Sequence, residues 1–145
     1  MSTKKVPQRM YQQIYHRQLV DGSVTSELPN GDHLLVGGPT SHHLDLYRAS
    51  DGLVLEMIPL SVYAHQKGVL SVAVAPDGRA AVAGCADGSV QIVDLCDGGR
   101  PLQVYHGHRG PVHAVAWSPK GTHLVSGGSD AAVLVWPVPA SLCLL

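Results

Sequence analysis

The sequence predicts an all-β chain made of repeated four-stranded units that stack on one another. Three observations support this fold class. A Pro-x-Gly turn recurs three times at nearly equal spacing, short runs of strand-forming residues separate the turns, and the inner runs are apolar on both faces. None of the runs has the length and period of a helix. A single sheet cannot cover two apolar faces, so the units must cover one another.

The composition is that of one globular domain. The chain has 145 residues, of which 45% are hydrophobic and only 14% are charged, and Phe is absent. The net charge of −1 favours neither nucleic acid nor a membrane surface as a partner. Residues 1–20 nevertheless carry a charge of +4, which leaves −5 for the remainder. This basic arm is either a solvated terminus or a contact for RNA or an acidic partner.

Cysteine usage and hydropathy predict an intracellular protein, located in the cytoplasm, the nucleus or both. Cys85, Cys96 and Cys143 are odd in number and form no CxxC pair, so neither a disulfide framework nor a zinc site is indicated. Buried, reduced thiols are typical of a reducing compartment. No apolar signal segment is visible, and no run reaches the roughly 18 apolar residues of a membrane span. No membrane partner is therefore expected.

Three landmarks define the repeat. Pro-x-Gly turns begin at Pro29, Pro76 and Pro119, at spacings of 47 and 43 residues. Pro interrupts the pairing of the preceding strand and Gly accepts a positive φ, as a hairpin turn requires. A glycine before a second turn repeats the same two spacings, and an Asp-Gly pair recurs after 46 residues. These further landmarks are Gly37, Gly84 and Gly127, and Asp51-Gly52 and Asp97-Gly98.

Each unit is expected to contain four short antiparallel strands. In unit one they are Ser23–Leu28, His33–Gly37, His43–Arg48 and Leu53–Ile58. In unit two they are Val69–Ala75, Arg79–Gly84, Ser89–Asp94 and Leu102–His106. In unit three they are Val112–Ser118, Thr122–Gly127, Ala132–Trp136 and a fourth over Ala140–Leu145.

The N-terminal segment resembles an outer strand. Tyr11–His16, YQQIYH, matches Pro101–His106, PLQVYH, at an offset of 90 residues, and Pro29 and Pro119 share that offset. Residues 11–16 are therefore expected to form the last strand of a preceding or closing unit. The expected organisation is a basic arm and outer strand at 1–16, then units at 17–59, 60–106 and 107–145.

The third unit resembles the WD-repeat β-propeller family, which has a period of about 40–45 residues, four strands per unit and a Gly-His and Trp-Asp signature. Gly107-His108 stands at the Gly-His position and Trp136 at the Trp position, with Pro137 in place of Asp. The other units match less closely, with Ala64-His65 and Val93-Asp94 in unit two and Tyr47-Arg48 in unit one. The resemblance implies a partial β-propeller of three blades, the first of them degenerate.

The resemblance also implies a buried chain of hydrogen bonds that runs from an indole through a hydroxyl and an imidazole to a carboxylate. Its members would be Trp136, Ser126, His108 and Asp130. An indole only donates, a hydroxyl and an imidazole do both, and a carboxylate accepts, so each group finds a match. Unit two keeps His65 and Asp87 but has Ala83 and Val93 at the other places. Because hydroxyl and indole are lost together, neither is left unpaired.

No catalytic residue, metal site, cofactor or small-molecule substrate is expected. His106, His108 and His113 lie within eight residues, but a strand, a loop and another strand would point them in different directions. Ser126 lies inside a strand with apolar neighbours, whereas a nucleophile needs an exposed position and an oxyanion hole. The Asp-Gly pairs lack the alternating ligands of a calcium loop. The chain is therefore expected not to be an enzyme, and a hydrolase that uses His108 and Ser126 is the enzymatic alternative.

The resemblance implies a scaffold or adaptor that binds other proteins. The contacts would lie on the face that carries the loops between units and the Asp turns. The residues expected to touch a partner are Lys67, Arg109, His42, His43, Ala86 and Ser129. The alternative is an RNA-associated factor that binds through the basic N-terminal arm.

Three blades fall short of the four to eight that close a propeller. An open arc would expose two apolar blade faces and unpaired strand edges. We expect the chain to be a fragment or short isoform of a longer propeller. The alternatives are self-association, in which two chains make six blades, and a partner that supplies the missing blades.

Overall fold

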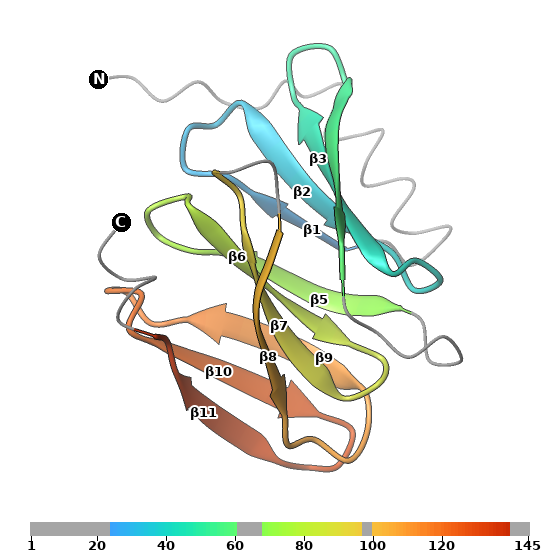
Figure 1. Cartoon of the computed structure of the whole chain (residues 1–145), viewed down its shortest axis with the longest axis vertical. Helices are drawn as coiled ribbons and strands as arrows, with labels where there is room; N and C mark the ends of the chain where they lie inside the picture. Colours follow the sequence, from blue (N-terminus) through green and yellow to red (C-terminus); the bar gives the residue numbers. More distant parts are fainter. Residues whose placement is uncertain (1–23, 61–67, 97–99, 140–145) are drawn as a thin grey trace.

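The computed structural model describes residues 24–60, 68–96 and 100–139, which form eleven antiparallel β-strands in three sheets and contain no helix (Figure 1). Sheet 1 contains β1 (Val24–Glu27), β2 (His33–Gly37), β3 (His43–Arg48) and β4 (Val54–Pro59). Sheet 2 contains β5 (Val69–Val74), β6 (Ala80–Cys85), β7 (Ser89–Asp94) and β8 (Arg100–His106). Sheet 3 contains β9 (Val112–Trp117), β10 (His123–Gly128) and β11 (Val133–Pro137).

The predicted all-β fold of stacked antiparallel sheets is confirmed. Strands pair in the order of the sequence in every sheet, and the turns that join the first two strands are the Pro-x-Gly turns. Sheet 3 has three strands among the described residues, and the residues predicted to form a fourth strand, 140–145, lie outside them. The strand expected over 11–16 also lies outside them. The division into units at 17–59, 60–106 and 107–145 stays a prediction.

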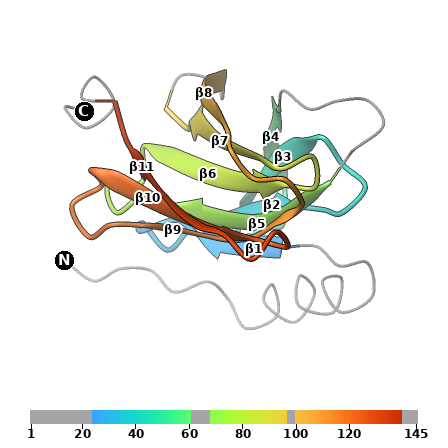
Figure 2. The same cartoon turned by 90° about the horizontal axis from the view of Figure 1, so that it is seen from below.

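The sheets stack with their first strands side by side. Strand β5 contacts β1 on one side and β9 on the other, and the views in Figures 1 and 2 agree on this arrangement. The outer strands β4 and β8 also touch. Neighbouring sheets therefore meet over their faces, as the blades of a propeller do.

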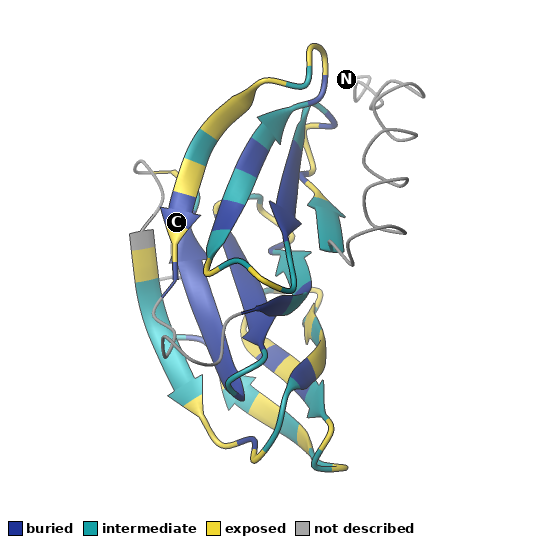
Figure 3. Ribbon diagram, turned by 90° about the vertical axis from the view of Figure 1, so that its right-hand side faces the viewer, coloured by how far each residue is buried: buried dark blue, intermediate teal, exposed yellow. Residues whose placement is uncertain are grey.

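Sheet 2 is buried on both faces, which explains its apolar strands. Every residue of β6 and β7 is buried, and Figure 3 shows these two strands as the darkest part of the molecule. Alternate residues of a strand point to opposite faces. The face toward sheet 1 carries Ala81, Ala83, Cys85 and Val93, which pack with Leu35, Leu44 and Ile58. The face toward sheet 3 carries Val82, Val90 and Ile92, which pack with Val112 and Leu124.

The repeated glycine of each unit receives the first valine of the next sheet. A Cβ added to Gly37 would lie 2.6 Å from Val69 Cγ1, and a Cβ added to Gly84 would lie 2.7 Å from Val112 Cγ1. Glycine is required at these two positions because a valine from the next sheet lies directly against the backbone. A Cβ on Gly127 would have no atom within 4 Å. The third glycine thus occupies the same place in the repeat but receives no neighbour among the described residues.

We expect Gly84→Ala to lower the free energy of unfolding by about 1–3 kcal/mol, because the added methyl group overpacks the contact between sheets 2 and 3. Gly127→Ala is the matched control, since its methyl group enters open space. Urea denaturation followed by circular dichroism measures both. Equal losses for the two variants would show that the glycine contacts do not set the spacing of the sheets.

Candidate functional site

Four polar side chains form a continuous hydrogen-bonded chain at the end of sheet 3. Trp136 Nε1, from β11, donates to Ser126 Oγ of β10 over 2.8 Å. Ser126 Oγ lies 2.7 Å from His108 Nε2, and His108 Nδ1 lies 3.1 Å from Asp130 Oδ1. Ser126 is fully buried and His108 is 9% exposed. The structure thus brings together the four residues that the sequence placed in one network, from two strands, a turn and the loop before β9.

The chemistry of the groups fixes the direction of these bonds. Asp130 also accepts from the backbone N–H groups of Arg109, at 2.9 Å, and Ala132, at 3.2 Å. The Arg109 N–H is the main reason that the pKa of Asp130 falls to about 2, the His108 bond adds to it, and burial opposes both. An ionised carboxylate accepts only, so the His108 Nδ1–H donates to it, and the Ser126 hydroxyl can donate to Nε2. Every member of the network is then satisfied.

Two glycines make room for this network. A Cβ on Gly128 would lie 2.8 Å from both Asp130 Oδ1 and His108 Nδ1, so a side chain there would break the pair. A Cβ on Gly107 would lie 2.6 Å from the ring of Trp136. The resemblance to the family points to Gly107 but not to Gly128. The feature of the sequence that could have indicated Gly128 is the double glycine at 127–128, because unit two has Gly84-Cys85 at the equivalent positions.

Tyr105, on the outer strand of sheet 2, contacts sheet 3 in two ways that the sequence pattern did not predict. Its ring stacks on Trp136 with centroids 4.9 Å apart, and its hydroxyl donates to the backbone oxygen of Pro137 over 2.6 Å. A stacked aromatic pair with a satisfied hydroxyl contributes packing and direction together. Trp136 therefore serves two neighbours, Ser126 within its own sheet and Tyr105 from the next.

Sheet 2 has a different polar arrangement at the equivalent place. Asp87 Oδ1 accepts from the backbone and hydroxyl of Ser89, at 2.9 and 2.5 Å, and Gln91 Nε2 donates to Ser89 Oγ over 3.0 Å. Ser89 and Gln91 are both fully buried, and the sequence analysis named neither. Ala83 and Val93 are fully buried apolar residues, while His65 lies outside the described residues. Sheet 2 thus lacks the hydroxyl and the indole that Ser126 and Trp136 supply in sheet 3, and it has Ser89 and Gln91 on β7 as its buried polar pair.

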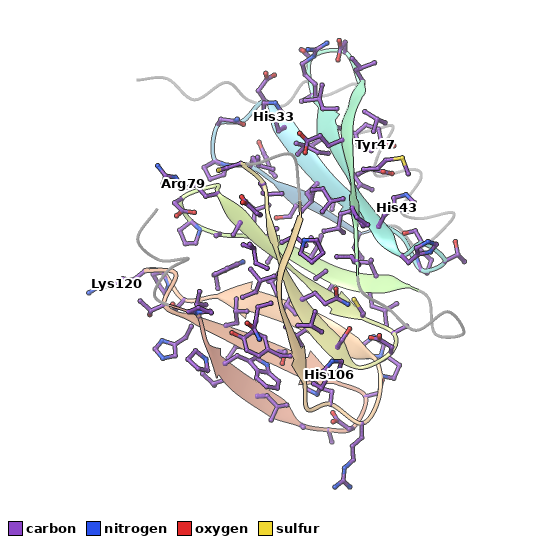
Figure 4. The ribbon with its side chains drawn as sticks, viewed as in Figure 1. His33, His43, Tyr47, Arg79, His106 and Lys120 are labelled. Carbon is purple, nitrogen blue, oxygen red and sulfur yellow. The ribbon has the colours of Figure 1, made fainter. Side chains whose placement is uncertain are left out.

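The residues predicted to touch a partner lie along one edge of the stack. Arg109, Ser129 and His42 are exposed, Ala86 and His43 are half-buried, and Lys67 lies outside the described residues. Figure 4 shows His43 on the opposite edge of the molecule from Arg79 and Lys120, which lie on the Pro-x-Gly turns. The Asp turns and inter-sheet loops are joined by backbone bonds, from Ser129 N to Pro111 O and from Ala86 N to Gly68 O, both 2.9 Å. We call the edge formed by these turns and inter-sheet loops, with Arg109, Ser129, His42, His43 and Ala86, the Asp-turn edge.

The described part of the chain offers no arrangement for metal chemistry. It contains no group of three or more His, Cys, Asp or Glu side chains placed to hold an ion. His113 is engaged with Ser129, with Nε2 2.6 Å from Oγ. Burial raises the pKa of the Cys85 thiol to about 12, so it stays protonated. Within residues 24–60, 68–96 and 100–139, no helix is present that could cross a membrane.

We expect His108→Ala to cost roughly 1–3 kcal/mol of unfolding free energy, because it removes the partner of both Ser126 and Asp130. His65→Ala should cost less, since unit two lacks the hydroxyl and indole that complete the chain. Thermal melting of the two variants makes the comparison. Similar shifts in Tm would contradict the assignment of the complete network to unit three.

Acid should weaken the fold through Asp130. Its folded pKa of about 2 lies below its ordinary value of 3.8, so its contribution is fully present above about pH 4 and is lost as the pH falls toward 2. Asp130→Asn should therefore flatten the fall of unfolding free energy between pH 5 and pH 2, to be followed by urea titrations.

Asp51 provides a comparison for this experiment. Its pKa is also about 2, because the Arg48 guanidinium bonds it, but both residues are exposed and far from the network. Asp51→Asn should change stability little at either pH, because an exposed ion pair contributes little, whereas Asp130→Asn should lose stability at pH 7 and little near pH 2. An unchanged acid limb in Asp130→Asn would refute the role of the carboxylate.

Comparisons with known proteins agree with this geometry. The chain matches the family "WD domain, G-beta repeat" over residues 57–94 and 99–137, more than half of its length. Each matched repeat begins with an outer strand or its end and continues through the first three strands of the next sheet. The chain is 32% identical over 115 residues to WD repeat-containing protein 1 of Mus musculus, covering 74% of this chain and 17% of that protein.

Two further relatives are of the same kind. WD repeat-containing protein 1 of Gallus gallus is 34% identical over 111 residues, covering 76% of this chain and 18% of that protein. The serine-threonine kinase receptor-associated protein of Dictyostelium discoideum is 33% identical over 78 residues, covering 54% of this chain and 26% of that protein. The chain thus spans about a fifth of the length of these relatives. The stacked antiparallel sheets, the His-Ser-Trp-Asp network and the two matched repeats together show that this chain belongs to the WD-repeat family.

Proposed function

We propose that the chain is a non-catalytic scaffold or adaptor that binds other proteins through the Asp-turn edge. WD repeats generally serve as interaction scaffolds, and this edge combines a fixed backbone with exposed side chains. Arg109 is the central residue of the proposal. Its N–H is held by Asp130 while its side chain is exposed, so its cation is presented from a rigid loop.

The hydrogen-bonded network supports this proposal because it stiffens the edge. The Asp130 carboxylate accepts hydrogen bonds from the Arg109 N–H in the loop before β9 and from the Ala132 N–H in the turn before β11. A surface that is ordered before binding loses less conformational entropy when a partner arrives. Ser126, by contrast, is fully buried and bonded to both His108 and Trp136, an environment that suits a structural hydroxyl rather than a nucleophile.

The proposal extends to the setting of the three sheets. We infer that they are part of a larger propeller, as a fragment or short isoform would be, because the segment that matches this chain makes up only 17% and 26% of the length of these relatives. An intracellular location, cytoplasmic or nuclear, is proposed from the free, buried thiol of Cys85. The alternative of RNA binding depends on the basic arm, which lies outside the described residues.

Affinity capture from cell extract tests the proposed edge. We expect Arg109→Glu with Ser129→Arg to lose proteins that the unaltered chain retains, because the cation at position 109 becomes a carboxylate and the side chain at position 129 becomes much larger. Lys120→Glu is the matched control, since Lys120 is an exposed cation on the opposite edge. Equal retention by all three chains, or equal loss in the control, would refute the Asp-turn edge as the binding surface.

A further inference from the structure

The outward side of sheet 3 is an uncovered apolar face. Val133 is 74% exposed, Val135 is 63% exposed and Val125 is 40% exposed. The register of the sheet aligns these side chains in two rows with small residues, Ala116–Val125–Val135 and Ala114–Gly127–Val133. We call these six residues the open face. In Figure 3 the lower end of the stack shows the exposed colour on these strands.

The same repeat positions are covered in sheet 2. Val82, Val90 and Ile92 precede Val125, Val133 and Val135 by 43 residues, and all three are fully buried beneath sheet 3. The open face therefore has the composition of a face that a β-sheet covers. Gly127 strengthens this comparison, because Gly84, its counterpart, receives Val112, whereas the space above Gly127 is open.

The far end of the stack differs from this end. On sheet 1 the side turned away from sheet 2 carries Leu34 and Val36, which are only 2% and 5% exposed. Asp45 lies on the same side, directly across β2 and β3 from Val36. Met57, the register partner of Asp45 on β4, lies on that side too and is 62% exposed, so the side is buried only in part and carries a carboxylate. A second chain that joined head-to-tail would have to bury Asp45 against the open face, whereas two open faces meet without burying a charge.

The open face does suit a second copy of itself. Strands β9, β10 and β11 contain no Asp, Glu, Lys or Arg, so two such faces can meet without burying a charge or opposing like charges. On this face the side chain of Val133 projects next to an open space. Val133 is the most exposed of the described large apolar residues, and a Cβ added to its register partner Gly127 would meet no atom within 4 Å. A two-fold axis between them would place each Val133 over the Gly127 of the other chain.

We propose that the 145-residue chain forms a symmetric dimer through the open face, with Val133 of each copy packed over Gly127 of the other. In a longer propeller the same face would be covered by other means, so the dimer is a property of the chain as it stands. A two-fold contact uses one face per chain, and association therefore stops at two. The proposal does not depend on the Asp-turn edge, which lies on the loops.

The size of the face sets the strength of the dimer. Three strands about 4.8 Å apart and five to six residues long, at about 3.3 Å per residue, give a footprint of roughly 14 by 18 Å. This is about 250 Å² per chain, well below the roughly 800 Å² per partner of a standard interface, so we expect a weak, rapidly reversible dimer with a Kd on the order of 100 µM.

Sedimentation equilibrium of the full chain from about 1 to 500 µM tests the proposal, and the expected result for the unaltered chain is a monomer–dimer equilibrium with the Kd estimated above. Val133→Glu should weaken the dimer at least tenfold, because it would bury two carboxylates across the axis. Met57→Glu is the matched control, since Met57 is 62% exposed on β4, away from the open face, and it should leave the dimer unchanged.

A second variant separates loss of the dimer from loss of the fold. Gly127→Val fills the space above β10, where an added Cβ meets nothing, so the chain should fold with an unchanged or higher Tm and yet dimerise at least tenfold more weakly. A monomer up to 500 µM, open-ended oligomers, or a dimer that resists both Val133→Glu and Gly127→Val would overturn the proposal. The last result would indicate pairing along the edge of β11 instead.

Discussion

Burial of sheet 2 on both faces is the constraint on which the rest of this structure depends. Every residue of its two central strands is buried, and the apolar ones are small or branched, so these strands would be unstable in water without a neighbour on each side. Sheets 1 and 3 supply those neighbours. The small residues also set the distance between sheets, because Gly37 and Gly84 allow a valine of the next sheet to approach the backbone. The stacked form follows from this demand rather than from any single turn or strand.

The polar network adds direction to this apolar stack. Apolar contact alone would let two sheets slide, but the bonds from Trp136 to Asp130 connect two strands, a turn and an inter-sheet loop at fixed distances. The same bonds order the edge that we propose as the binding surface. Asp130 therefore contributes both to the stability of the fold and to the proposed binding surface. Its carboxylate accepts from the buried His108 imidazole and from the backbone N–H of the exposed Arg109.

Much of this could be predicted from the sequence, and the parts that could not share one cause. Turn spacing gave the strands to within about two residues, and the resemblance to the family gave the four network residues. Strand β8 begins at Arg100, two residues before the predicted Leu102, because an outer strand tolerates proline on its free side. Gly128, Tyr105 and Gln91 were missed because their roles depend on atoms from other strands, which no spacing in the sequence reveals.

One backbone detail illustrates the same limit. Ala131 has a φ of 63°, in the left-handed region, at the position where unit two has Gly88 with a φ of 88°. An alanine there costs conformational energy that glycine would not. The sequence shows the exchange of Gly for Ala but not that the turn keeps its shape in spite of it. Asp130 accepts from the Ala132 N–H within the turn and from the Arg109 N–H in the loop before β9, and these bonds favour the observed shape.

The burial of β6 and β7 has a consequence for how the chain opens. Between the described strands, the main contacts join neighbouring sheets, so the two outer sheets can detach singly while the middle sheet loses its cover only after one of them has left. Amide hydrogens of β6 and β7 should then exchange with deuterium more slowly than those of any other strands, and protection should decline toward both ends. The chain would fray from its ends inward, with its longest-lived structure at its centre.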